Sequence, residues 1–145
     1  MIFLAGSVLG GFVIHFLDAP FLDLEHINYQ KLPFPEANSK IYMNARAMGL
    51  LGDIEVVRFC AEDIDIEKPL GGSGCVVLYT NEAYYRRERP NILHIYTASS
   101  AIPKDEPDRL GQVKVQIHEV KSFDQFQDLE KDFEDQKLGM INIPF

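Results

Sequence analysis

The alternation of apolar and polar side chains is clearest in the last third of the chain. Val113, Val115 and Ile117 are separated by polar residues, including His118 at the end of the run. A period of two is typical of a strand with one face on the core and one in solvent. The pattern therefore predicts a half-buried strand beginning at Val113.

A helix is predicted directly after this strand. Ser122 is a suitable N-cap, and Gln125 three residues later completes a capping box. Gly139 is placed where a helix commonly ends. Apolar residues recur between these points at the spacing of one helix face. They are Phe123, Phe126, Leu129 and Phe133. Because such a stripe needs apolar surface to cover, we expect the helix to pack on a sheet.

A second helix is predicted over residues 39–52. Ser39 would cap it and Gly52 would end it. Four apolar residues recur at steps of four, three and three, which gives a single apolar stripe. They are Ile41, Ala45, Met48 and Leu51.

Short apolar runs elsewhere predict further strands. Residues 54–60, 63–67, 75–80 and 92–97 have the length and composition of strands, and the glycine-rich segment 71–74 fits a hairpin turn. Residues 81–89 between two of these runs are polar, and Asn81 could cap a short helix there. The apolar tail 140–145 fits a last edge strand or a docked plug.

The apolar N-terminal stretch, residues 2–17, raises the question of a membrane segment. It is shorter than the ~20 residues of a spanning helix. No Lys or Arg precedes it and no small-residue cleavage site follows, as a signal peptide would require. A buried hairpin with its turn at Gly10 and Gly11 is the favoured interpretation, and an oligomer contact is left open. The chain is therefore expected to be cytoplasmic and free of membranes.

These elements together predict the fold class. Strands and helices do not alternate regularly along the chain, which disfavours a doubly wound parallel sheet. Its 145 residues fit one domain. We expect a single α+β domain over residues 1–145, with a largely antiparallel sheet of about five to seven strands and two main helices on one face.

Composition narrows the classes of partner. The formal net charge of −8 disfavours nucleic-acid binding by a diffuse basic surface, because phosphate contacts need clustered Lys and Arg. Cys60 and Cys75 both lie in apolar runs, where buried reduced thiols are the favoured interpretation. The sequence leaves the oligomeric state open.

Catalytic and metal-binding motifs are not complete anywhere in the sequence. Asp63, Asp65 and Glu67 would share one face of a strand and could hold Mg²⁺, but a charged edge strand that resists aggregation is favoured. His15 and His94 lie in apolar runs that favour a structural role. No catalytic residue, metal site or cofactor is therefore predicted, although the sequence leaves metal binding by the aspartates or histidines open.

One basic cluster stands out in this acidic chain. Arg86, Arg87 and Arg89 follow two tyrosines in the polar segment 81–89. Guanidinium groups suit carboxylate or phosphate ligands. The cluster is the best candidate for an anion site, and a small enzyme or ligand-binding module built around it is the alternative function.

The last predicted helix carries the largest concentration of negative charge. Its outward carboxylates form the candidate partner-binding surface: Asp124, Asp128, Asp132, Glu134 and Asp135. Complementary charge steers association with basic molecules. The leading hypothesis is therefore a non-enzymatic interaction protein, similar to an immunity protein or an inhibitor, that binds a basic macromolecular partner.

Overall fold

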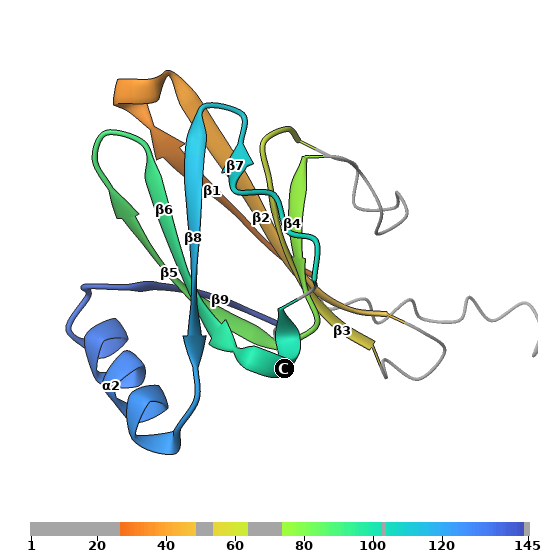
Figure 1. Ribbon diagram of the computed structural model, residues 1–145, viewed down its shortest axis with the longest axis vertical. Helices are drawn as coiled ribbons and strands as arrows, with labels where there is room; N and C mark the ends of the chain where they lie inside the picture. The colour runs from red at the N-terminus through yellow and green to blue at the C-terminus, as the bar shows by residue number, and fades with distance from the viewer. Residues whose placement is uncertain (1–26, 49–53, 64–73, 103, 144–145) are drawn as a thin grey trace, which may run out of the picture.

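The computed structural model describes residues 27–48, 54–63, 74–102 and 104–143. Two β-sheets lie against each other in this part of the chain (Figure 1). The first has four strands in the order β1-β2-β3-β4, and the second has five in the order β7-β8-β6-β5-β9. One helix, α2, lies beside the five-stranded sheet.

The strands of the first sheet follow each other along the chain and pair antiparallel: β1 (Ile27–Phe34), β2 (Ser39–Met48), β3 (Ile54–Cys60) and β4 (Cys75–Leu78). The second sheet contains β5 (Glu82–Glu88), β6 (Ile92–Ala98), β7 (Arg109–Leu110), β8 (Val113–Val120) and β9 (Gly139–Asn142). Its pairs are antiparallel except β6 and β8, which run parallel. Helix α2 (Phe123–Glu134) connects β8 to β9, and the short helices are η1 (Pro35–Ala37) and η2 (Ser99–Ala101).

Apolar side chains from both sheets form one core between them. Ile41, Met43 and Phe59 of the first sheet are buried with Leu93 and Ile95 of the second. Burial of such side chains is the main favourable term in folding. The alternate residues of β5, β6 and β8 point to the opposite face of the five-stranded sheet, which α2 partly covers.

The predicted α+β fold with two main helices is wrong. Two packed sheets dominate the described part of the chain, which contains nine strands and a single α-helix. The segment predicted as the helix 39–52 begins with strand β2, whose core-facing residues alternate as Ile41, Met43, Ala45 and Ala47. Its other face is also buried, at Asn44 and Arg46. The segment fits both periods, because Ile41, Ala45 and Met48 also recur at a helical spacing.

The predicted short helix at 81–89 is wrong as well. This segment is strand β5, which pairs with β6 on one side and β9 on the other. Ala83 and Tyr85 face the core, whereas Tyr84 and Arg86 face α2 and solvent. Two ladders of backbone hydrogen bonds outweigh the weak local preference for a capped helix.

Most other predicted elements are confirmed. Strands occur at 54–60, 75–78, 92–98 and 113–120, and the tail contributes β9 at an edge of its sheet. Helix α2 begins after Ser122 as predicted, but it ends at Glu134 rather than at Gly139. Gly139 instead lies against the ring of Tyr85, where a Cβ atom would overlap the aromatic carbons.

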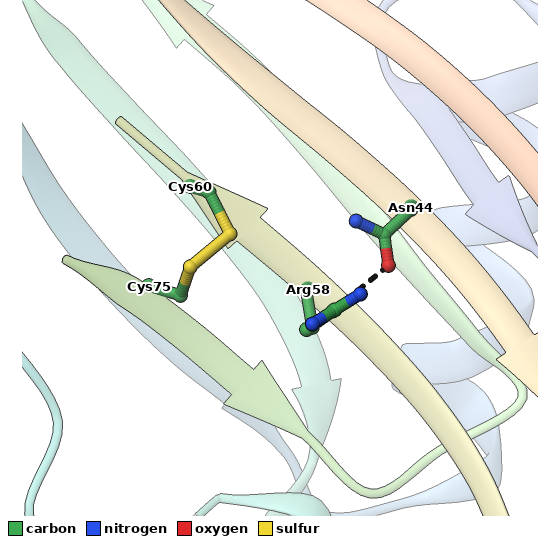
Figure 2. The surroundings of a disulfide bond; sticks show 4 residues. All are labelled: Asn44, Arg58, Cys60 and Cys75. Atoms are coloured by element: carbon green, nitrogen blue, oxygen red, sulfur yellow. Dashed lines mark hydrogen bonds between the residues drawn. A yellow bond between two sulfur atoms is a disulfide. The ribbon is translucent and has the colours of Figure 1, made fainter. Parts of the chain in front are cut away.

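The expectation of two reduced thiols is also wrong. Cys60 and Cys75 face each other across β3 and β4 and form a disulfide, with their Cα atoms 4.2 Å apart (Figure 2). Each cysteine ends or begins a strand, so the antiparallel register brings them together. On the same sheet, Arg58 Nε donates a hydrogen bond of 3.0 Å to Asn44 Oδ1.

Several predictions concern residues outside the described ranges. These are the N-terminal hairpin 2–17, most of the predicted strand 63–67 with the carboxylates of Asp65 and Glu67, most of the glycine-rich turn 71–74, and the end of the predicted helix at Leu51 and Gly52. Among the residues that are described, no helix has the length and apolar character needed to cross a membrane.

Candidate functional site

Helix α2 begins with a well-formed cap. Ser122 Oγ accepts a hydrogen bond of 3.3 Å from the backbone N–H of Gln125. The side-chain oxygen of Gln125 in turn accepts one of 2.8 Å from the backbone N–H of Lys121. Asp124 lies in the first turn, where the helix dipole favours negative charge. The cap therefore fixes where the acidic helix starts and how its faces are oriented.

The apolar stripe of α2 determines which residues point outward. The rings of Phe126 and Phe133 pack edge-on against Tyr84 of β5, with centroids 5.8 Å and 6.1 Å away. Phe123, predicted as part of this stripe, is instead 73% exposed. Four of the five predicted partner-binding carboxylates are exposed, and the fifth, Asp132, is half-buried; the four are Asp124, Asp128, Glu134 and Asp135.

Two of these five carboxylates already have a cationic partner. Lys137 Nζ lies 3.1 Å from Asp132 Oδ1 and 3.1 Å from Asp135 Oδ2. Hydrogen bonds to these two carboxylates raise the pKa of Lys137. Asp124, Asp128 and Glu134 have no ion pair within the described ranges. These three carboxylates are the ones left to meet an external cation.

The three predicted anion-binding arginines do not converge on one point. Arg86 and Arg87 are neighbours on strand β5 and so point to opposite faces of the sheet. Arg87 donates a hydrogen bond to the backbone oxygen of Pro33. Arg89 lies beyond the strand and pairs with Glu36 at 3.2 Å. Arg86, Arg87 and Lys137 nevertheless line a pocket of about 410 Å³ near the start of β9.

A hydrogen-bonded chain of Glu88, His94 and His118 crosses three strands on the α2 side of the five-stranded sheet. His94 Nε2 lies 2.7 Å from Glu88 Oε2, and His94 Nδ1 lies 2.8 Å from His118 Nε2. His94 is only 6% exposed. The ring of Tyr96 stacks on His118 at 4.7 Å, with 17° between the planes. We refer to these three residues as the histidine chain.

Sequence reasoning missed this chain. It placed His118 on the polar face of its strand and assigned His94 a structural role. The parallel pairing of β6 with β8 sets Tyr96 opposite His118, and His94 lies two residues before Tyr96 on the same face of β6. No local pattern indicates which strands pair. The available signal in the sequence was the spacing of two residues, which puts His94 and Tyr96 on one face of their strand and Gln116 and His118 on one face of theirs.

The neutral histidine chain has one proton arrangement that satisfies both bonds. The carboxylate of Glu88 only accepts, so His94 carries its proton on Nε2. His94 Nδ1 then accepts, and His118 Nε2–H donates to it. The lone pair of His118 is left on Nδ1. Burial, and then electrostatic interaction with His94 and Arg86, lower the pKa of His118, which keeps this ring neutral at neutral pH.

Metal binding receives no geometric support within the residues the structure describes. No three His, Cys, Asp or Glu side chains are grouped there to hold an ion. Asp63 instead accepts a hydrogen bond of 2.7 Å from the hydroxyl of Tyr29. Burial and then this bond raise the pKa of Tyr29 to about 12. Asp63 therefore has a structural partner on β1.

Comparisons with protein families, with curated proteins and with solved structures find no match for this chain. The protein's own surface is therefore the guide to its function. The features that carry chemistry are the acidic face of α2, the histidine chain beside it and the arginine-lined pocket near β9.

Proposed function

We propose that this protein is a non-enzymatic interaction protein that binds a basic macromolecular partner through the outward face of α2. An inhibitor or immunity protein that covers the basic surface of another protein is the kind of molecule that fits. The charge of −8 for the whole chain supports this proposal, because a negative field attracts basic partners from a distance.

The observation that carries the proposal is the arrangement of charge on α2. Asp124, Asp128 and Glu134 are exposed and lack an ion pair in the described part of the chain. Phe123 lies beside Asp124 and is 73% exposed. An exposed aromatic side chain bordered by charges is a common composition for an interface centre and its rim.

The test is a comparison of two variants that carry the same net charge. The first replaces Asp124→Asn, Asp128→Asn and Glu134→Gln, which leaves the Lys137 pairs intact. The second replaces Glu55→Gln, Glu62→Gln and Asp105→Asn, three exposed carboxylates away from α2. Both variants and the unaltered protein are used to capture partners from native lysate, and the affinity of the captured protein is then measured by calorimetry.

We expect the α2 variant to bind roughly tenfold or more weakly, because it loses three charge contacts of up to ~1 kcal/mol each. The control variant should bind nearly as well as the unaltered protein. Equal losses in the two variants would mean that only net charge matters, and no loss in either would remove α2 from the interface. Both results would contradict the proposal.

A second candidate function rests on the pocket lined by Arg86, Arg87 and Lys137. A ligand-binding module that takes an anion there would be stabilised by its ligand through mass action. Arg87 is already bonded to Pro33 and Lys137 to two aspartates, which leaves Arg86 as the less committed cation. A thermal-shift screen with inorganic phosphate and nucleotides tests this function, and Arg86→Ala should abolish any shift that arises in the pocket.

The cellular location predicted from sequence, the cytoplasm, needs its own test. Disulfides persist mainly in oxidising compartments. The bond between Cys60 and Cys75 therefore weighs against a reducing cytoplasm. Thiol alkylation of native cell extract, followed by mass spectrometry of these two cysteines, distinguishes the oxidised from the reduced form.

A further inference from the structure

A small pocket lies between α2 and the ends of β6 and β8. Its volume is about 280 Å³, and its walls include Tyr96 and His118 from the sheet and Asp128 and Leu129 from the helix. Sites for drug-sized ligands are usually ~300–1,000 Å³. A pocket at the lower limit of that range suits a single protruding side chain better than a whole cofactor.

Hydrogen-bond acceptors dominate the polar groups of this pocket. Asp128 supplies a carboxylate, whereas Glu119 borders the pocket and its own carboxylate pairs with Lys121 at 3.1 Å. His118 has its Nε2 bonded to His94, so Nδ1 is its remaining acceptor in the neutral chain. The Gln125 oxygen already accepts from Lys121. A ligand that brings several N–H donors and a positive charge would satisfy these groups.

The remaining wall is aromatic and apolar. Tyr96 lies parallel to His118, and Leu129 faces them from α2. A flat cation is attracted to an aromatic ring and tolerates apolar contact along its stem. The guanidinium of arginine combines a planar shape, five donors and a permanent charge. Lysine has the charge but presents its donors from a single point.

We infer that this pocket binds the side chain of one arginine from the basic partner. The inference rests on the proposed function, because it assigns an anchor residue to the same α2 surface. Asp128 belongs to both the outward face and the pocket, so a partner lying along α2 reaches the pocket without leaving that face.

Binding of arginine in the pocket has a pH dependence that follows from the histidine chain. A proton taken up at His118 replaces an acceptor with a donor and adds a positive charge. The charged or titratable groups around His118 are Arg86, His94 and Tyr96 of the sheet, Asp128 of α2, and Glu119 with its partner Lys121. Arginine and this proton therefore compete, and affinity falls as pH drops below the pKa of His118.

The experiment is an NMR titration of the labelled full chain with N-acetyl-arginine amide. N-acetyl-citrulline amide, which has nearly the same shape but no charge, is the matched probe. At pH 7.5 we expect shifts at Tyr96, Val120 and residues 125–129 with the arginine probe and none of comparable size with the citrulline probe. Asp128→Asn should weaken binding about three- to fivefold. Asp105→Asn, an exposed carboxylate away from α2, should leave it within about twofold.

The pH arm uses His118→Gln. The unaltered protein should bind the arginine probe more weakly below the pKa of His118, measured by the same NMR method, than at pH 7.5, and the variant should lose that difference. Equal binding of the two probes, shifts that map elsewhere, or equal effects of the two aspartate variants would overturn the inference. If the partner still requires α2 while the arginine probe does not bind, the pocket assignment fails and the proposed function stands.

Discussion

His94 and His118 are 24 positions apart in sequence, yet His94 Nδ1 lies 2.8 Å from His118 Nε2 across the parallel strands β6 and β8. Glu88 completes the chain at 2.7 Å from the other nitrogen of His94. A carboxylate that orients one imidazole, which in turn orients a second, fixes the tautomer of both rings. These two hydrogen bonds connect His118, which lines the pocket beside α2, to Glu88 on β5.

The first prediction concerns the charge of Arg86. Burial, His94 and Arg86 all lower the pKa of His118, so Arg86→Gln should raise that pKa towards its ordinary value of 6.5. Arg87→Gln is the matched control, because Arg87 lies on the same strand but on its opposite face. The measurement is an NMR titration of the His118 ring protons. A pKa that is unchanged in the first variant, or raised equally in both, would contradict this account of the site.

The second prediction separates binding from folding on α2. Phe123 is 73% exposed, whereas Phe126 packs on the ring of Tyr84. Phe123→Ala should change the free energy of unfolding by less than about 0.5 kcal/mol. Phe126→Ala should lower it by roughly 1–2 kcal/mol, less than the ~3–5 kcal/mol for a fully buried phenylalanine. Urea denaturation measures both values, and a larger loss for Phe123→Ala would show that its side chain is part of the core.

The third prediction concerns the disulfide. The disulfide between Cys60 and Cys75 closes a loop with a sequence separation of 15. A cross-link of that size lowers the entropy of the unfolded chain and so raises the free energy of unfolding by about 3 kcal/mol. The double variant Cys60→Ala, Cys75→Ala should therefore unfold at a lower urea concentration. A reducing agent should shift the unaltered protein in the same direction and leave the variant unchanged. Coincident curves for all samples would mean that no disulfide forms.

The fourth prediction is a pH dependence that arises at Glu106. Burial raises the pKa of this carboxyl to about 7 from 4.5, and Oε1 has no hydrogen-bond partner in the part of the chain described. Between pH 4.5 and about pH 7 the folded protein binds more protons than the unfolded chain. The free energy of unfolding therefore falls as the pH rises through this range. Glu106→Gln should flatten the dependence and raise the urea midpoint at pH 8.

The control for this prediction is Asp105→Asn, because Asp105 is an exposed neighbour. This variant should keep the pH dependence of the unaltered protein. The account of Glu106 is wrong if the stability of Glu106→Gln declines between pH 5 and pH 8 as steeply as that of the unaltered protein.

Local patterns predicted the elements whose two faces differ in environment. The strand at Val113 has one buried face, and helix α2 has a cap at Ser122 with a stripe on one side, so their periodicity is readable. Strand β2 also alternates, with Ile41 and Met43 on the core side and polar Asn44 on the other. The same segment has apolar residues at a helical spacing, and a local pattern that fits both periods does not decide between them.

The candidate site also has one part that local sequence patterns predict and another that they do not. The acidic face of α2 could be predicted because it lies within one helix. The histidine chain could not, because it depends on the pairing of β5, β6 and β8, which is decided by contacts far apart in sequence. The disulfide depends in the same way on the register of β3 with β4.

The most direct test of the central claim is the salt dependence of binding to the captured partner. The dissociation constant is measured at several salt concentrations for the unaltered protein and for the α2 variant Asp124→Asn, Asp128→Asn, Glu134→Gln. Salt screens contacts between exposed charges, so we expect a steep loss of affinity with salt for the unaltered protein and a clearly shallower loss for the variant. Equal slopes for the two proteins would contradict it.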